Sequence, residues 1–341
     1  MMIIGVDAHK ATHTAAAVNR QTAELLDQLT VDARDHGHQR LLEWAIELDE
    51  DRVWAIEDAR NLSGGLERHL LAAGEHVLRV PPKLMAQTRK SARSFSKSDP
   101  IDALAVARAA IREPDLPVAT LPGIEYEIGL LVDHRKDLVT DCSGHQRRLR
   151  WHLHELDPDL KIPASGLTNP ANLTKIARRL QRLPQTTQVR ICRELVRRIA
   201  ELNRRAAEIK RELTKLVKAH APQLLQIVGC GPLCAASILA EIAGINRFAT
   251  EAQLASYAGV APLDASSGRQ QRHRLNRTGN RQLNCALHVI AVTQIRMHPP
   301  AMAYYARRQS EGKTNREALR TLKRYLARTI FNSLKKPMLD T

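Results

Sequence analysis

Aromatic residues make up only 3% of this 341-residue sequence. A core with so few rings must consist mainly of Leu, Ile, Val and Ala, a composition that favours helices. The five cysteines show no disulfide framework, which predicts reduced thiols in a cytoplasmic protein. No apolar run is long enough to span a bilayer, and the first residues lack the apolar segment of a signal peptide. We therefore expect no membrane partner.

Acidic residues are nearly absent from the last part of the sequence. Residues 268–341 contain 16 Lys/Arg against 3 Asp/Glu, whereas residues 1–114 contain 15 against 17. Most of the net charge of +16 is therefore at the C-terminal end. This distribution predicts a polyanionic partner, nucleic acid first, with a merely soluble basic surface as the alternative.

The first third of the sequence predicts an α/β domain. Short apolar runs indicate strands in the segments 2–10, 12–20, 24–31, 52–58 and 76–82. Helical spacing indicates helices at 35–48, 64–74 and 98–112. Strands first, followed by alternating strands and helices, indicate a layered α/β domain over residues 1–114.

The rest of the sequence is predicted to be mostly helical. Residues 115–220 contain a Pro-rich linker and two long helices, near 125–156 and 187–219, whose apolar spacing suits a coiled-coil arm of a dimer or packing within the chain. Residues 221–341 form a basic domain. In it, Gly229 and Gly231 of "VGCGP" suggest a helix-hairpin-helix element that binds phosphate, with an ordinary helix cap as the alternative.

Four carboxylates stand at the ends of predicted elements in the first domain. Asp7 ends the first strand, and Glu57 ends a later one. Asp99 and Asp102 share a face at the start of a helix, because they are three residues apart. Such acids can gather in one cleft and offer the oxygen ligands that Mg²⁺ prefers. For the helix pair, capping and interaction with the helix dipole are the alternative.

A serine pair and a run of arginines mark the C-terminal domain. Ser266 and Ser267 precede a glycine, and five arginines follow closely in the sequence: Arg269, Arg272, Arg274, Arg277 and Arg281. Composition alone predicts a basic turn that binds a nucleic-acid backbone. The arginines could also neutralise charge on a phosphate that reacts.

These segments together resemble a known family. "IIGVDAHK", "WAIED", "HVLRVPPK" and "SKSDPIDALAVA" resemble the RuvC-like (RNase H-like) Asp-Glu-Asp-Asp domain of insertion-sequence 110 family transposases. The region from "LLQIVGCGP" through "GVAPLDASSGRQQRHRLNRTGNRQLN" is similar to that family's C-terminal serine domain. By position, Asp7, Glu57, Asp99 and Asp102 match the family's four acids. Ser267 matches its serine nucleophile, with Ser266 one residue away.

The resemblance implies a DNA transposase or recombinase of a mobile element. The acids would bind Mg²⁺, and the serine would attack a DNA phosphate to form a covalent intermediate that conserves bond energy. Donor and target DNA would be chosen by a guide RNA, the bridge RNA. Strand exchange needs at least two active sites, so we expect a dimer that pairs into a tetramer. A bacterial or archaeal cytoplasm, with the protein on the nucleoid in use, is the implied location.

Other interpretations use the same residues differently. A metal-dependent nuclease of the Holliday-junction-resolvase type would share the acids but hydrolyse with water and need no serine. An actin- or sugar-kinase-like ATPase would need glycine-rich phosphate loops, and "AHK" stands where the first of these would be. A non-catalytic nucleic-acid-binding scaffold would suit the basic tail and the helical arm. Zinc at His9 and His13 is disfavoured, because H-x-x-x-H pairs its two rings on one face of a helix, as in zincins, whereas this segment is predicted to be a strand.

Overall fold

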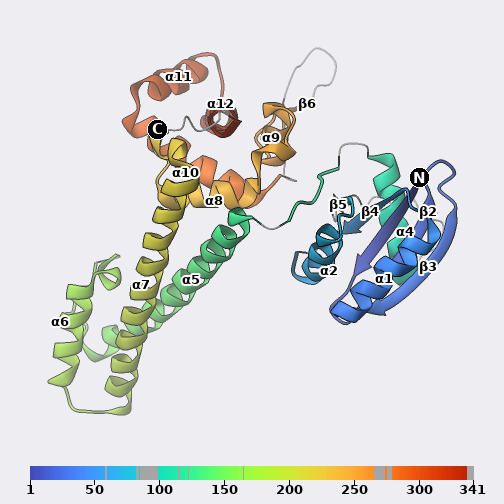
Figure 1. Ribbon diagram of the computed structural model, residues 1–341. Coiled ribbons are helices and arrows are strands. Elements are labelled where there is room, and N and C mark those ends of the chain that lie inside the picture. The colour runs from blue at the N-terminus through green and yellow to red at the C-terminus, as the bar shows by residue number, and fades with distance from the viewer. Residues whose placement is uncertain are drawn as a thin grey trace. The chain divides into compact units, whose positions relative to one another are not determined.

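The computed structural model describes residues 1–57, 60–81, 84, 99–113, 116–121, 123–163, 165–264, 273–274 and 279–335. The chain forms two compact units, Met1–Pro122 and Gly123–Thr341 (Figure 1). Each unit has its own hydrophobic core. Among the described helices, none combines the length and the apolarity that a membrane crossing requires. All five cysteines are free, as expected.

The first unit contains a five-stranded mixed sheet. Its strands are β1 (Met2–Ala8), β2 (Thr12–Asn19), β3 (Leu25–Asp32), β4 (Arg52–Glu57) and β5 (Val77–Val80), in the spatial order β3-β2-β1-β4-β5. Strands β1, β2 and β3 pair antiparallel, whereas β1–β4 and β4–β5 are parallel. The sheet confirms the predicted α/β domain, and all five predicted strands are present.

Helices cover both faces of this sheet. The helices are α1 (Asp35–Leu48), α2 (Arg60–Ala72) and α4 (Asp99–Arg112). Successive residues of β1 point to opposite faces, as the geometry of a strand requires. Met2, Ile4 and Val6 pack in the core that includes α1 and α2, whereas Ile3 packs in the core with α4. By the same alternation Gly5 and Asp7 lie on the α4 face.

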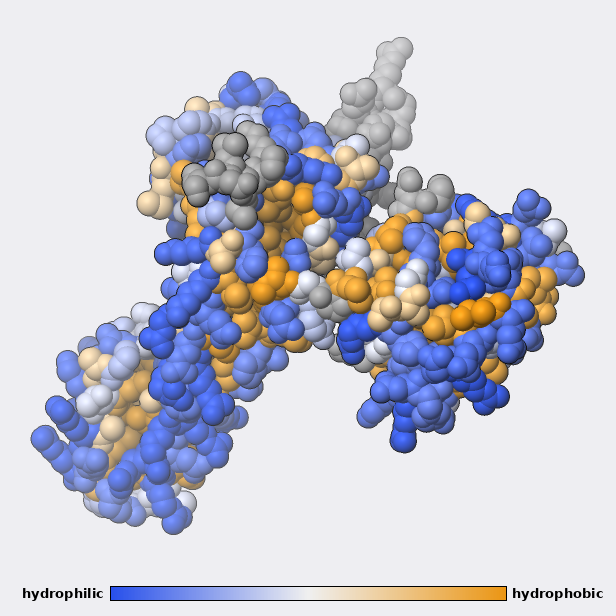
Figure 2. All heavy atoms as spheres, in the orientation of Figure 1, coloured by the Kyte–Doolittle hydropathy of each residue, from blue (hydrophilic) through white to orange (hydrophobic). Residues whose placement is uncertain are grey.

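The second unit begins with a helical hairpin. Its helices are α5 (Ile124–Leu156), α6 (Pro170–Gln181) and α7 (Thr187–His220), and Figure 1 shows α5 and α7 side by side. Buried residues of all three share one core, for example Leu149, Leu173 and Ile199. The predicted apolar positions of the second long helix are all buried or half-buried within this chain. Hydrophilic side chains cover most of the visible hairpin surface (Figure 2).

The remainder of the second unit is a cluster of short helices. It contains α8 (Pro232–Ile242), α9 (Glu251–Tyr257), α10 (Arg281–Met297), α11 (Pro299–Ser310) and α12 (Asn315–Lys335), with a small pair of strands, β6 (Leu263–Asp264) and β7 (His273–Arg274). The ends of α5 and α7 join its core. The mostly helical character of this unit was predicted, although helices α6, α9 and α11 were not.

Candidate active site

Strand geometry brings the first two acids to one edge of the sheet. Strands β1 and β4 are parallel, and Val6 lies opposite Ile56. The next residues along the two strands are Asp7 and Glu57, and they fall on the α4 face because side chains alternate. Asp7 is 4% exposed, and Glu57 is half-buried at the end of β4.

A close approach of helix to strand brings the other two acids. A Cβ atom on Gly5 would lie 2.3 Å from the carbonyl oxygen of Ala103 and from the amide nitrogen of Ala107. Only glycine at this position lets α4 pack so tightly on β1. The start of α4 thereby comes to the end of β1. Asp102 is buried there at 4% exposure, whereas the side chain of Asp99 is 50% exposed.

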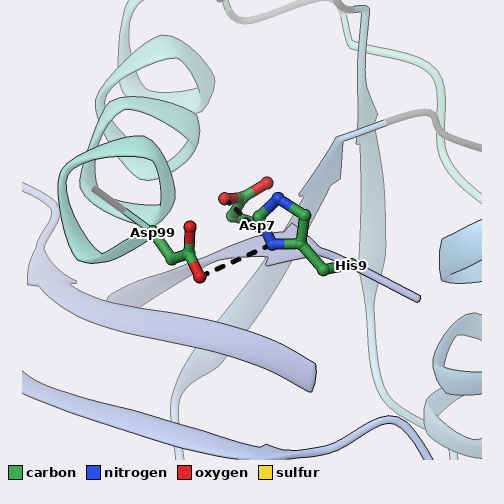
Figure 3. Close-up of side chains that lie close together, drawn as sticks. All are labelled: Asp7, His9 and Asp99. Carbon is green, nitrogen blue, oxygen red and sulfur yellow. Dashed lines mark ion pairs between the residues drawn. The ribbon is translucent and has the colours of Figure 1, made fainter. Parts of the chain in front are cut away.

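His9 completes the cluster. Its Nδ1 atom lies 3.6 Å from Oδ2 of Asp7 and 3.8 Å from Oδ2 of Asp99. Figure 3 shows the imidazole next to both carboxylates, one from the end of β1 and one from the start of α4. Each of the three residues offers a ligand atom within 4.8 Å of the others.

The electrostatics of the cluster fit a divalent cation. Burial raises the pKa of Asp7 to about 6. His9 opposes this rise, and neighbouring carboxylates add to it, namely those of Asp102, Glu57 and Asp99. The Oδ2 atom of Asp7 is buried without a hydrogen-bond partner. A cation would satisfy that oxygen and cancel the repulsion among the acids, so the residues present suit a divalent metal.

Sequence reasoning weighed His9 only as half of a zinc pair with His13. The structure places the two histidines in different surroundings. His13 is buried and stacks on His38 of α1, with ring centroids 5.2 Å apart, and His38 in turn meets His69 of α2 at 5.8 Å. His9 instead stands beside the acids. Its position two residues after Asp7 was the available signal, because a short turn after a strand keeps such neighbours at the same sheet edge.

The serine segment is described only at its base. Ser266, Ser267, Arg269, Arg272 and Arg277 lie outside the described residues. Arg274 is in β7, opposite Leu263 of β6, so the proposed serine is in the connection between these two paired strands.

The backbone before the serine segment, at Gly259, contacts the backbone after it, at Gly279. A Cβ atom on Gly279 would lie 2.2 Å from the Cα of Gly259, so the backbones touch where the segment leaves and returns. Asn280 fixes this crossing. Its amide nitrogen donates to the carbonyl of Tyr257 at 2.6 Å, and its side-chain amide donates to the hydroxyl of Tyr257 at 3.1 Å and to Glu241. Its Oδ1 atom accepts from the backbone amide of Leu283 and so caps α10.

The remaining candidates for nucleic-acid binding occupy helix starts and a turn. Arg281 is exposed as the first residue of α10. Gly231 is exposed as the N-cap of α8, before Pro232. Gly229 has φ +84°, and a Cβ there would lie 3.0 Å from Cβ of Thr293. This glycine is therefore needed for the turn and for packing on α10, which is the ordinary structural explanation for it.

Two family models match the chain. Residues 4–158 match a transposase model of the DEDD IS110 type, and residues 221–306 match the Transposase IS116/IS110/IS902 family. Together they cover more than two thirds of the sequence. The chain belongs to the IS116/IS110/IS902 family of transposases.

Full-length relatives agree with this assignment. The chain is 27% identical to the 44.8 kDa protein of insertion element IS116 from Streptomyces clavuligerus, over 99% of this chain and 96% of that protein. It is 26% identical to the 42 kDa protein of insertion element IS900 from Mycobacterium paratuberculosis, over 94% and 92% of the two chains. A solved structure, T. thermophilus RuvC in complex with Holliday junction substrate, is 18% identical, covers 33% of this chain and 94% of its own, and has a TM-score of 0.26.

Proposed function

We propose that this transposase cuts and rejoins DNA with two sets of residues, an acidic Mg²⁺ site and a serine nucleophile. Asp7, Glu57, Asp99 and Asp102 would hold the metal, with His9 beside them. The observation that supports this most is the buried Oδ2 atom of Asp7, which has no hydrogen-bond partner and faces further carboxylates. A cluster that costs folding energy in this way is typical of a functional site.

When bound, Mg²⁺ would supply positive charge at phosphate oxygens. In our proposal the Oγ atom of Ser267 forms a bond to phosphorus while the bond from phosphorus to one sugar oxygen breaks. The hydroxyl proton leaves the serine, and the released sugar oxygen takes up a proton. Rejoining reverses these changes, since a sugar hydroxyl of the incoming strand displaces the serine. No oxidant, reductant or nucleotide cofactor is consumed, because bond energy is conserved in the phosphoserine ester.

The arginines would position the DNA for this exchange. Arg269, Arg272 and Arg274 are proposed to bind the non-bridging oxygens of the reacting phosphate, since guanidinium groups form two parallel hydrogen bonds with phosphate. Arg277, Arg281, Gly231 at the N-terminus of α8 and Gly229 in the preceding turn are proposed to bind the backbone further away. These assignments follow from the basic C-terminal region and from the matched family.

The organisation of the chain is also part of the proposal. We assign residues 1–114 as a RuvC-like catalytic domain, 115–220 as a linker with a coiled-coil arm, and 221–341 as the serine domain. Donor and target DNA are the substrates, and a bridge RNA is the proposed guide. A dimer that pairs into a tetramer would supply the active sites that strand exchange requires.

A strand-transfer assay with the co-purified RNA tests the acidic site. Glu57→Gln and Asp102→Asn should each abolish transfer and leave DNA binding within about twofold, because a charge is removed but the shape is kept. Glu47→Gln is the matched control, since this exposed acid in α1 is outside the cluster. Normal transfer by either cluster variant would remove the metal site from the mechanism.

A further inference from the structure

The second unit contains a cavity whose lining includes several arginines. It has a volume of about 560 Å³ and is lined by residues of α9, α11 and α12 and by Val260 and Pro262. Five arginines and two tyrosines line it, against a single acid, Glu251. Such a volume is within the usual range for small-ligand sites. Neither the acids nor the serine motif account for this cavity.

The two tyrosines form an aromatic surface in the cavity. The rings of Tyr304 (α11) and Tyr325 (α12) have centroids 6.2 Å apart and are tilted by 35°. Tyr325 is 50% exposed, so part of its ring is accessible to a ligand. Arginine guanidinium groups lie over both rings, Arg308 at 5.1 Å from the centroid of Tyr304 and Arg328 at 5.1 Å from that of Tyr325.

The polar groups of the cavity are incompletely paired. Glu251 contacts Arg324 at 3.1 Å and Arg328 at 3.8 Å. Even so, the Oε2 atom of Glu251 and the Nε atom of Arg308 are buried without a hydrogen-bond partner. One is an acceptor and the other a donor, and each buried orphan costs free energy that a ligand with complementary groups would recover.

We propose that this cavity binds an unpaired nucleotide segment of the nucleic acid that the transposase handles. Its bases would stack on Tyr304 and Tyr325, and its phosphates would bind the surrounding arginines. Accessible aromatic rings among arginines are the combination that binds single strands, because every base has a face that can stack. A duplex hides its base faces, so it could use only the arginines.

The place of the cavity in the sequence supports this assignment. Pro262, on its wall, precedes Ser267 by five positions. A strand held here would therefore be bound by the same unit that carries the serine motif. The inference goes beyond the proposed function, because holding a single strand requires neither the metal nor the nucleophile.

Fluorescence anisotropy with short labelled oligonucleotides tests the cavity in the full-length protein with EDTA present. Tyr325→Leu should raise the Kd for a single strand about tenfold, the loss of roughly one stacked base. It should leave the Kd for a duplex and for an abasic strand of the same length unchanged. Arg328→Ala should weaken the binding of all three ligands. It should also reduce the slope of log K against log salt concentration for the single strand by about 0.7, the value for the loss of one phosphate contact.

Two matched controls lie outside the cavity. Tyr126→Leu removes a ring of α5 that is 46% exposed, and Arg211→Ala removes a guanidinium of α7 whose side chain is 74% exposed. Neither should change the Kd for the single strand beyond about twofold. Equal losses of affinity in Tyr126→Leu and Tyr325→Leu would overturn the proposal.

Photo-crosslinking identifies the contacts directly and does not depend on how a variant folds. Strands that contain 4-thiouridine in RNA or 4-thiothymidine in DNA should crosslink to peptides that contain Tyr304 or Tyr325. Crosslinks with RNA alone would make the guide the occupant, and crosslinks with DNA would make it a displaced DNA strand. Crosslinks that fall only outside α11 and α12, or a change in oligomeric state of Tyr325→Leu with unchanged oligonucleotide binding, would overturn the proposal. The result is independent of strand transfer, so it stands or fails separately from the proposed chemistry.

Discussion

Replacing Asp7 with asparagine should make the metal-free protein more stable. The pKa of Asp7 is raised from 3.8 to about 6, first by burial and then by the neighbouring acids. Each pKa unit corresponds to 1.36 kcal/mol, so ionised Asp7 costs the folded first unit about 3 kcal/mol at pH 8. Asparagine has nearly the same shape and no charge, so Asp7→Asn should recover most of this free energy.

The stability gained by Asp7→Asn should increase with pH. Between pH 3.8 and about 6 the folded state holds the Asp7 proton more tightly than the unfolded state does. The contribution of this residue to stability is therefore present below pH 4 and is lost as the pH rises to 6 and above. The advantage of Asp7→Asn should be close to zero at pH 4 and should reach its full value by pH 8.

Urea unfolding in EDTA, followed by tryptophan fluorescence, measures the difference. Trp54 is fully buried in the first unit, whereas Trp151 of the second unit is 78% exposed. A Trp151→Phe background therefore makes the signal report on the first unit. Added Mg²⁺ should stabilise only the wild-type side chain and reduce the gap, since binding to the folded state shifts unfolding by mass action.

Asp27, an aspartate whose pKa is shifted in the opposite direction, serves as the control. The pKa of Asp27 is lowered, chiefly by the hydrogen bond that Nε1 of Trp44 donates to it at 2.9 Å. Asp27→Asn should therefore not stabilise the protein. Asp7→Asn with equal or lower stability at pH 8 would refute the reasoning, because the carboxyl would then be adequately paired within the chain.

Other parts of the structure give further predictions. Gly5→Val should destabilise the first unit by about 3 kcal/mol in urea unfolding, because α4 must move away from β1, whereas Gly144→Ala, with open space around it, should stabilise α5 by about 0.5–1 kcal/mol. Burial and, to a smaller extent, the nearby His38 lower the pKa of His13 from 6.5 to about 4. The free energy of unfolding should therefore fall by roughly 3 kcal/mol as the pH drops from 6.5 to about 4, and His13→Gln should reduce this pH dependence. Asn280→Ala should cost about 2–3 kcal/mol, more than the roughly 1 kcal/mol for Asn169→Ala, which only caps α6.

Local rules of sequence and strand geometry explain where each of the four predicted acids lies on its element. Asp7 and Glu57 end apolar strands, and two parallel strands bring their carboxyl ends to the same sheet edge. Asp99 and Asp102 share a face at a helix start. The tight packing of α4 on Gly5 depends on how close a helix and a strand approach each other in space. No local pattern gives that distance.

Prolines account for two of the helices that sequence reasoning missed, α6 and α11. No helix was predicted to start at Pro170 or Pro299, yet each is the first residue of a helix, α6 and α11. Proline suits this position because its missing N–H is not needed there. The sequence also could not decide whether the long helices pack within one chain or between two. An apolar stripe suits a dimer arm and an internal hairpin equally, and here α5 and α6 cover it.

The tyrosine and arginine cavity could not be found from the sequence. Tyr304 and Tyr325 are 21 positions apart and belong to helices separated by a turn. The basic tail predicts a polyanion, but only the packing of α11 on α12 brings the two rings to one surface.

Covalent capture of DNA tests the central claim most directly. Protein with its co-purified RNA, Mg²⁺ and end-labelled DNA would be denatured, and the labelled adduct would be mapped by peptide mass spectrometry. The account predicts a nucleotide attached through Ser267, absent in Ser267→Ala and unchanged in Ser266→Ala. Cleaved DNA that is entirely free of protein would contradict the account and would favour hydrolysis by water at the acidic site.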